Sequence, residues 1–415
     1  MSLKYGISLA VCLFTQSVLA SFANYNSILI GDQASGMGGA YTALSNDSSA
    51  VAFYNPAGLA FLEGQSFSAA VGIYKKFDTT FGAEEDYTKA PLRINQGFFR
   101  AIPSSTGNII RRGDYTMGLS IVVPDFDNFK GDLRSNTTST TTLSYVDESL
   151  WVGGGIAKKI TEDQSLGLTM YYTARSYTRS LNDRSFPNAT EAILYNSEKL
   201  ITENAIVANL GYQARLSDQW SFGASLRLPN LTVKGTGSYF ESKVITNPYT
   251  STSKNLPDQT TTVRIPGKLT LGLAYRNSDA YLLSFDATIH QALQYEDFDD
   301  PTIATRYSHS GIFNLAAGAE VRLYSWLKAR VGGFTNFSSH PDPDPGVGRG
   351  QPDKVDQLGF SANLVLISSD QLQYTFGGYY SGGRGRSLQR INQQNEVIIV
   401  TQHVFTMLVG TAFSF

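Results

Sequence analysis

The sequence is short of cysteine and of charge. Cys12 is the only cysteine, and it lies in an N-terminal apolar stretch that we expect to be removed. The mature chain would then have no disulfide, no thiolate nucleophile and no cysteine-bound metal. Charged residues make up 16% of the chain, against about 25% in typical soluble proteins. With a net charge of −2, the chain is not basic enough to favour nucleic acid as a partner.

Long apolar runs are also missing. Beyond the N-terminus no segment stays apolar for about 18 residues, so the sequence predicts no transmembrane helix. The apolar stretch from Ile7 to Leu19 follows Lys4 and is too short to cross a bilayer, which is typical of a secretory signal peptide. We expect residues 1–20 to be that signal peptide. A buried N-terminal helix is the less favoured alternative, because nothing downstream resembles a helical domain.

The residue sets of common catalytic and metal centres are not apparent. The four histidines are far apart in the sequence and no pair has the spacing of helical metal ligands; they are His290, His309, His340 and His403. There is no Gly-x-Ser-x-Gly nucleophile motif. Acidic residues near 296–300 and 342–344 are better explained as solvated loop charge than as a cation site. We therefore expect no catalytic residue, no metal site and no cofactor, and a protein that is not an enzyme.

What the sequence does have is repeated alternation of apolar and polar residues. One example is the set Tyr115, Met117, Leu119, Ile121 and Val123. This period of two places apolar side chains on one face of a β-strand. The segments are longer than usual strands and match the roughly 9 to 11 residues that a tilted strand needs to cross a bilayer. The expected strands are 65–77, 93–103, 114–124, 148–160, 164–178, 201–216, 219–235, 261–276, 280–292, 309–324, 326–337, 355–368, 370–381 and 401–415.

The connections alternate between short and long. Tight turns near 161–164, 217–219, 277–279, 324–325 and 368–370 separate long polar segments near 78–92, 125–147, 179–200, 236–260, 293–308, 338–354 and 382–400. Membrane barrels have this rhythm of short periplasmic turns and long outer loops. The segment 103–113 is longer than the other short turns. The C-terminal strand ends in Phe415, the kind of strand that barrel assembly machinery reads. The sequence thus predicts an all-β fold, a transmembrane antiparallel β-barrel of about 14 strands.

The block from residue 24 to residue 64 does not alternate. It is rich in small residues and turn formers, and such a backbone cannot face lipid because its polar groups would lack partners. We expect residues 21–64 to form a plug, or hatch, inside the lumen of a barrel formed by residues 65–415. A phosphate-binding loop in this block is excluded, because Met37 and Gly38 stand where lysine and serine or threonine are needed.

At this block the chain resembles the FadL-type outer-membrane transporters of long-chain fatty acids and aromatic hydrocarbons. The resemblance is carried by the segment 34–40, by the segment 50–60 with Asn55-Pro56-Ala57 at its centre, by Gly118 with Pro124, and by the segment 265–276 that begins Ile-Pro-Gly-Lys. It implies that the plug blocks the lumen, with Asn55, Pro56 and Ala57 as the plug motif. It also implies that ligands enter an apolar pocket from outer loops and leave sideways at a kinked strand.

Two features of the barrel bear on this mechanism. Gly118 in the middle of the third strand and Pro124 at its end favour a kink or lateral opening, since glycine weakens a strand and proline removes a ladder donor. Room for the plug is an equally good interpretation of Gly118. The loop 179–200 contains Pro187, where we expect a short helix to start.

Several charged residues have inward parity in the predicted barrel. Plug anchoring and charge balance within a lumen network is the favoured interpretation, and binding of a ligand carboxylate is the alternative; the residues are Arg175, Lys268, Asp286, Glu320 and Arg330.

The predicted function is an outer-membrane channel for uptake of hydrophobic small molecules, namely long-chain fatty acids, related lipids or aromatic hydrocarbons, by ligand-gated passive diffusion. The alternative is a non-transport surface protein, either an adhesin or a structural barrel. The expected partners are the hydrophobic ligand, outer-membrane lipid, lipopolysaccharide and the barrel assembly machinery. We expect a monomer in the outer membrane of a Gram-negative-type cell envelope.

Overall fold

The computed structural model describes residues 23–48, 50–62, 66–82, 92–135, 139–278, 280–347, 351–369, 371–391 and 394–414. The predicted signal peptide, the predicted boundary between plug and barrel at residue 64, and Phe415 lie outside these ranges. In the described ranges, no helix has both the length and the apolar character needed to cross a lipid bilayer.

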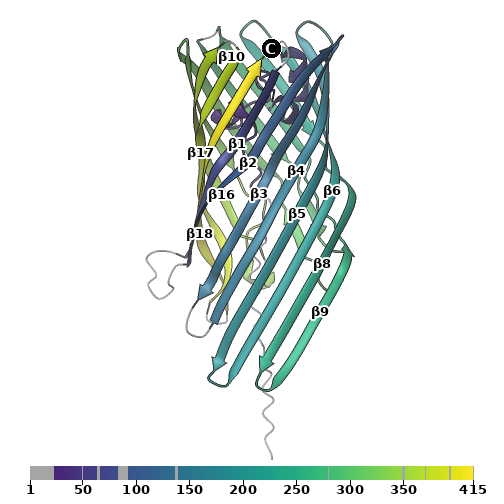
Figure 1. The fold of residues 1–415 in the computed structure, drawn as a ribbon, viewed down its shortest axis with the longest axis vertical. Helices are drawn as coiled ribbons and strands as arrows, with labels where there is room; N and C mark the ends of the chain where they lie inside the picture. The colour runs from purple at the N-terminus through teal and green to yellow at the C-terminus, as the bar shows by residue number, and fades with distance from the viewer. Residues whose placement is uncertain are drawn as a thin grey trace, which may run out of the picture.

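An antiparallel β-barrel forms the body of the protein (Figure 1). In the wall, β6 pairs with both β7 and β8, β11 pairs with β14 past the separate β12–β13 hairpin, and β1 pairs with β18 to join the chain ends. Because β8 and β9 extend β7 and β10, the ring closes with 14 strands. The predicted barrel of about 14 strands is confirmed. The strands are β1 (Ser66–Phe81), β2 (Leu92–Arg112), β3 (Tyr115–Ser135), β4 (Ser139–Lys159), β5 (Gln164–Asn188), β6 (Glu191–Arg215), β7 (Trp220–Arg227), β8 (Leu231–Thr246), β9 (Tyr249–Thr260), β10 (Lys268–Asn277), β11 (Tyr281–His290), β12 (Leu293–Glu296), β13 (Arg306–His309), β14 (Ile312–Tyr324), β15 (Leu327–Asn336), β16 (Lys354–Ser369), β17 (Leu372–Ile391) and β18 (Gln394–Ser414).

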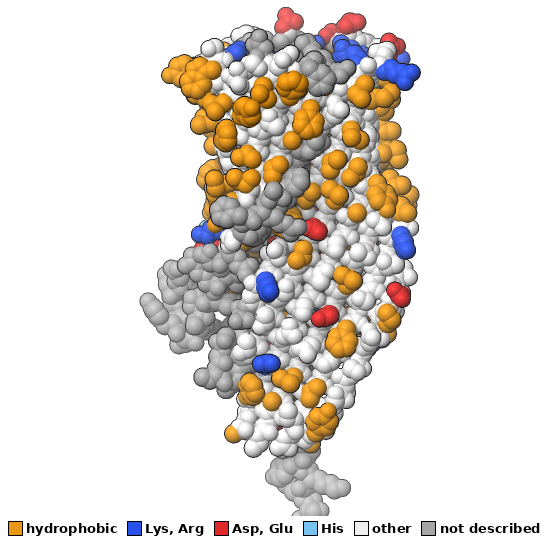
Figure 2. All heavy atoms as spheres, viewed as in Figure 1, with side chains coloured by type: hydrophobic (Ala, Val, Ile, Leu, Met, Phe, Trp, Pro, Cys, Tyr) orange, Lys and Arg blue, Asp and Glu red, His pale blue; other side chains and the backbone are white. Residues whose placement is uncertain are grey.

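The two faces of the wall differ in the way that the alternation predicts. On β3, Met117 and Leu119 are exposed on the outside, while Thr116 and Ser120 are buried inside. Figure 2 shows hydrophobic side chains gathered over the half of the wall that carries the short turns, and a mostly polar surface over the other half. Exposed aromatic residues mark the short-turn end; they are Tyr115, Trp220, Tyr281, Tyr324, Trp326, Tyr374 and Phe413. This arrangement is an apolar belt with an aromatic girdle at one rim.

The wall is much taller on one side than on the other. β5 and β6 each have 25 residues, whereas β10 and β11 have 10 each. The strands β3 to β6, with β8 and β9, continue past the apolar belt as a projecting sheet (Figure 1).

Most of the segments predicted as long loops are strands of this projecting part. The expected loops at 125–147, 179–200, 236–260 and 382–400 are largely strand in the described ranges. Beyond the belt both faces of a strand are free to carry polar residues, so the alternation that marks a strand in lipid is lost. The helix expected near Pro187 is wrong, because β5 runs to Asn188 and turns into β6. Likewise, β2 runs to Arg112 and replaces the long turn expected at 103–113.

The N-terminal segment lies inside the barrel at its short-turn half (Figure 1). It contains two short helices, α1 (Asp32–Gly36) and α2 (Val51–Tyr54), and one 3₁₀ helix, η1 (Pro56–Phe61). A further 3₁₀ turn, η2 (Pro345–Val347), follows β15. Nearly all of the plug is buried, including the main chain and side chains of Ala34, Met37 and Leu59. The plug therefore fills the lumen across the width of the barrel.

Candidate functional site

Asn55 holds the centre of the plug. Its side-chain amide donates to the carbonyl of Thr42 at 2.7 Å and to the carbonyl of Tyr212 on β6 at 3.0 Å, while its oxygen accepts from the amide of Ala57 at 3.2 Å. Pro56 opens η1 with Asn55 as its N-cap, a position that suits proline because its missing N–H has no helical partner there. The predicted plug motif thus joins two plug segments to the wall.

Four glycine pairs on the wall face the plug. In each pair the two glycines stand opposite each other on adjacent strands: Gly118 with Gly155, Gly167 with Gly211, Gly223 with Gly272, and Gly318 with Gly332. A Cβ atom on any of these eight glycines would lie within 3.0 Å of a neighbouring atom, and in every pair the plug supplies such an atom. Because the glycines carry no side chain, the plug packs directly on the wall backbone. We call these four pairs the glycine seat.

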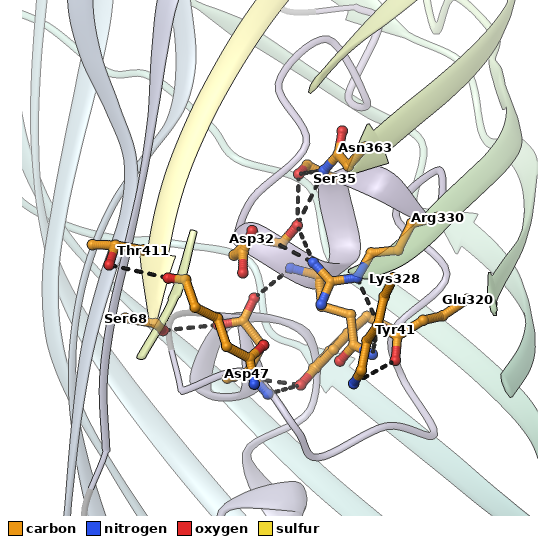
Figure 3. A network of polar contacts seen from close by, with 12 residues as sticks. Asp32, Ser35, Tyr41, Asp47, Ser68, Glu320, Lys328, Arg330, Asn363 and Thr411 are labelled. Atoms are coloured by element: carbon orange, nitrogen blue, oxygen red, sulfur yellow. Dashed lines mark hydrogen bonds and ion pairs between the residues drawn. The ribbon is translucent and has the colours of Figure 1, made fainter. Parts of the chain in front are cut away.

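An ion-pair network ties α1 to β14 and β15 (Figure 3). Arg330 Nε lies 2.6 Å from Glu320 Oε2, and Arg330 Nη1 lies 3.5 Å from Oδ1 of Asp32 in the plug. Lys328 contacts the other oxygen of Glu320 at 3.2 Å. Two of the predicted lumen charges, Glu320 and Arg330, are therefore brought together, and they anchor the plug.

Asp286 anchors a different part of the plug. Its Oδ2 accepts hydrogen bonds from the amides of Tyr41 and Thr42 at 2.9 Å each, and from the Thr42 hydroxyl at 2.7 Å. It does not pair with Glu320 or Arg330, although all three were expected as one network. Asp286 satisfies two buried main-chain donors that have no helix or strand partner.

A cavity lies in the lumen between the plug and the far end of the barrel. It comprises about 1210 Å³ of space free of atoms, counted out to its open mouth. Its lining includes Phe53 and Tyr54 from the plug, Trp151 from β4, and Val263 and Ile265 from the connection between β9 and β10. Phe53 and Trp151 have ring centroids 6.1 Å apart. This lining gives the cavity an apolar, aromatic side on which a hydrophobic molecule can pack.

Two cations border this aromatic side. Within the described part of the chain, the Lys268 ammonium has no hydrogen bond or ion pair, and it lies 5.4 Å from the centre of the Phe53 ring. Arg227 lies 5.8 Å from the Trp151 ring and donates to the carbonyl of Pro266 at 3.2 Å. Arg227 had not been singled out from the sequence, because its inward direction depends on the register of β7.

Arg175 is the remaining predicted charge, and it is already paired. It binds Asp147 on β4 through two hydrogen bonds of 2.9 and 2.6 Å, and the Asp147 side chain is fully buried. A bidentate pair of this kind leaves the guanidinium little capacity for a ligand. Of the five charged residues predicted to face the lumen, Lys268 is the one that faces the cavity without such a partner among the described residues.

Three histidines that are far apart in the sequence meet at the outer side of the cavity. Tyr25 stacks on His290 with ring centroids 4.6 Å apart, and His309 and His340 are 5.4 Å apart. His309 Nδ1 lies 2.8 Å from the hydroxyl of Ser339. Sequence spacing gave no sign of this cluster, because the infolded hairpin of β12 and β13 creates it. Among the residues that the structure describes, no group of three or more His, Cys, Asp or Glu is arranged to hold a metal ion.

The structure places Gly118 and Pro124 in different surroundings. Gly118 is paired on both sides, with Ile109 and Gly155, and a Cβ atom there would lie 2.8 Å from Leu59 of the plug. Pro124 lies in a bulge at which the register between β3 and β4 shifts, and it lines the cavity. The interruption of β3 is therefore at Pro124, and Gly118 makes room for the plug.

Comparison with known proteins identifies the fold through solved structures and not through sequence. No protein-family model matches the sequence, and no curated protein sequence matches it. Solved structures do match. A FadL homologue of Pseudomonas aeruginosa has a TM-score of 0.66 and 15% identity, and the match covers 93% of this chain and 100% of that one. The toluene transporters TodX of P. putida and TbuX of Ralstonia pickettii have TM-scores of 0.66 and 0.60 and identities of 13% and 14%, and each match covers 93% of this chain and 98% of the transporter. This chain has the fold of the FadL-type channels, a closed 14-strand barrel with its N-terminal segment inside.

Proposed function

We propose that the protein is an outer-membrane channel for hydrophobic small molecules. The observation that carries this proposal is the aromatic cavity enclosed between a seated plug and the outer end of a barrel with an apolar belt. Short turns lie at the periplasmic end of bacterial barrels. The plug then closes the periplasmic half, and the cavity is reached from outside. The matched structures from Pseudomonas and Ralstonia include toluene transporters, which supports the same class of cargo.

The cations at the cavity favour cargo that carries an acidic group. A carboxylate that binds Lys268 and Arg227 would leave its apolar part against Phe53 and Trp151. Long-chain fatty acids and aromatic acids fit this description better than neutral hydrocarbons, because an ammonium without an anion is costly to bury. Movement is by passive diffusion, with lateral exit into the membrane at the interruption of β3 and without enzymatic conversion.

Uptake into cells tests this proposal. Cells with and without the protein are given labelled oleate, methyl oleate or toluene, and initial uptake is compared. We expect the protein to accelerate oleate uptake most, and Lys268→Met to remove the preference for oleate over its methyl ester. Equal uptake with and without the protein for all three compounds would contradict the channel.

A surface adhesin or structural barrel is the second candidate. The projecting sheet of β3 to β6 with β8 and β9 favours it, because that sheet stands outside the apolar belt and presents a polar surface. If the protein is an adhesin, removing the tips of the hairpins should abolish adhesion. If it is a channel, the same deletion should leave uptake through the cavity largely intact.

We further propose that the chain acts as a monomer, inserted by the barrel assembly machinery among lipopolysaccharide.

A further inference from the structure

The strands β12 and β13 form a hairpin that is not part of the wall. They pair only with each other in the described sheets, as a separate two-stranded sheet. The chain leaves the wall after His290 and rejoins it at Ile312, and these two residues stand opposite each other on β11 and β14. The end of the hairpin reaches Lys199 on β6, although β10 and β7 lie between β11 and β6 in the wall. The hairpin therefore folds inward, and we call residues 291–311 the inner hairpin.

The inner hairpin separates two cavities. Tyr295 lines the aromatic cavity, and together with Tyr307 it also lines a smaller cavity against Tyr177 and Ile201 of the projecting sheet. The two cavities adjoin, because Tyr295 and Val263 belong to both linings. The smaller one has about 250 Å³ of space free of atoms, against about 1210 Å³ in the aromatic cavity. The passage between the inner hairpin and the projecting sheet is therefore narrow.

A buried ion pair holds the end of the inner hairpin against the wall. The ammonium of Lys199 on β6 contacts the carboxylate of Asp297, and their side chains are 6% and 1% exposed. The ammonium also donates to the hydroxyl of Thr305 at 2.9 Å and lies 5.0 Å from the centre of the Phe298 ring. The other carboxylate oxygen of Asp297 accepts from the Thr305 amide at 2.7 Å. The cation thus belongs to the wall and the anion to the inner hairpin.

The main-chain contact between the inner hairpin and the wall is short. Thr261 and Phe298 form an isolated bridge. Beside it, the amide of Thr262 donates to the carbonyl of Asp297 at 3.1 Å, and the amide of Asp299 donates to the carbonyl of Thr260 at 3.2 Å. By contrast, β11 pairs with β14 at each of its ten residues. The inner hairpin can therefore leave the projecting sheet without breaking any ladder of the wall.

The returning leg of the inner hairpin has room to bend. A Cβ atom on Gly311 would meet no described atom closer than 3.5 Å. The neighbouring Ser310 is held at the wall, because its amide donates to the carbonyl of Ser339 at 2.6 Å. A loosely packed glycine beside a fixed residue is a suitable hinge, since glycine adopts many backbone conformations.

We propose that the inner hairpin is a lid at the outer mouth of the aromatic cavity, and that the Lys199–Asp297 pair holds this lid closed. The proposal rests on the proposed channel function. Cargo enters when the end of the inner hairpin leaves the projecting sheet and the smaller cavity widens into the aromatic one. Opening returns both charges to water, and this hydration offsets much of the attraction that is lost.

Hydrophobic cargo favours the open lid for a second reason. In the closed lid, Phe298 and Ile303 of the inner hairpin pack in one buried cluster with Tyr177 and Ile201 of the projecting sheet. Opening exposes these apolar surfaces, which is unfavourable in water. A molecule with an apolar part can cover them, so it binds the open lid better than the closed one and shifts the equilibrium toward opening.

A disulfide that locks the lid gives the first test. Thr260 and Asp299 are exposed, and in the antiparallel register around the bridge they stand opposite each other. Their Cα atoms are then about 5.5 Å apart, a spacing that a disulfide can join. Oxidised Thr260→Cys/Asp299→Cys should reduce oleate uptake to the level of cells without the protein, and a reductant should restore it. Thr202→Cys/Thr236→Cys is the matched control, because this pair joins β6 to β8 without touching the lid.

Substitution of the ion pair gives a readout that does not depend on transport. Lys199→Met leaves the Asp297 carboxylate without its cation only while the lid is closed, so the ratio of open to closed lid should rise about 100-fold or more. The double variant Lys199→Met/Asp297→Asn has no charge left to bury and should close again. Lys234→Met, an exposed lysine on β8, is the control. If Lys199→Met fails to assemble, the neutral and polar Lys199→Gln replaces it.

Spin labels measure the position of the lid. Labels at Pro301→Cys in the inner hairpin and Thr202→Cys on β6 should move apart in Lys199→Met and return in the double variant. Labels at Thr202→Cys and Ser251→Cys, both on the projecting sheet, should keep their distance. An unchanged lid distance in Lys199→Met overturns the role of the ion pair, and full uptake through the locked protein overturns the lid. If the wild type transports no probe, the channel function fails while the distances still report on the lid.

Discussion

Gly167 on β5 and Gly211 on β6 stand opposite each other, and the plug main chain at Pro56 and Ala57 lies against both. Gly167→Val or Gly211→Val would place methyl groups within the space of that main chain. We expect either change to unseat the plug or to lower stability by about 3 kcal/mol. Unfolding in urea from lipid vesicles, together with protease sensitivity of the N-terminal segment, measures both effects. Gly154→Val is the control, since Gly154 has open space around it apart from a carbonyl at 3.9 Å.

Asn55→Ala tests the plug motif through its hydrogen bonds. The substitution leaves the buried carbonyls of Thr42 and Tyr212 without the amide that now binds them. We expect a loss of about 2 kcal/mol, concentrated in the plug, and frequent small-ion conductance in planar bilayers. Asn188→Ala, in the exposed hairpin between β5 and β6, should leave conductance at the wild-type level. A silent Asn55→Ala channel would count against a role of this residue in seating the plug.

Arg175 and Lys268 should respond in opposite ways to replacement by methionine. Arg175→Met leaves the fully buried Asp147 without its bidentate partner and should cost about 3–5 kcal/mol of stability. Lys268→Met removes a cation that has no ion pair in the described structure, so stability should change by less than about 1 kcal/mol or increase. Urea unfolding of both variants makes the comparison. Similar losses of stability in the two variants would mean that Lys268 is bound as tightly as Arg175.

Acidification should loosen the histidine cluster at the outer side of the cavity. Burial holds the pKa of His309 at about 3, with smaller contributions from His340 and Arg175, and burial also lowers the pKa of His340 to about 4. Both lie well below the value of about 6.5 for an unfolded histidine. Between these values the unfolded segment binds more protons than the folded one, so stability falls as pH falls. From pH 6.5 to pH 5 the loss is at most about 2 kcal/mol for each histidine.

Hydrogen exchange at pH 7.5 and pH 5 measures this loosening. Amides of β13 and of the segment that follows β15 should exchange faster at pH 5, after correction for intrinsic rates. The double variant His309→Gln with His340→Gln should remove most of the difference. His403→Gln is the control, because this exposed histidine on β18 contacts Tyr380 outside the cluster. Protection that does not depend on pH in the native protein would contradict the prediction.

The strand pattern was predictable where lipid imposes it. Alternation such as Met117 and Leu119 outside against Thr116 and Ser120 inside revealed 14 strands and the short turns. It failed beyond the belt, where residues of β5 near Arg184 and of β6 near Tyr195 meet water or protein on both faces. A polar strand in that environment has the composition of a loop, and only pairing with a neighbour distinguishes the two.

The site was predictable only in part, because its contacts are long-range. Inward parity singled out Glu320 and Arg330, but the link of Arg330 to Asp32 joins residues about 300 positions apart. The glycine seat was not seen for the same reason. Gly118 was noticed alone, and its pairing with Gly155 depends on the register of β3 against β4.

The unequal height of the wall has a consequence for the route that a solute takes to the cavity. A strand of 25 residues such as β5 is about 80 Å long at about 3.3 Å per residue, and a tilt of about 40° leaves roughly 60 Å of height against an apolar belt of about 25 Å. In a membrane coated with sugar chains, that excess stands within the carbohydrate. A hydrophobic cargo of the proposed channel would therefore meet the projecting wall before it had crossed the sugar layer.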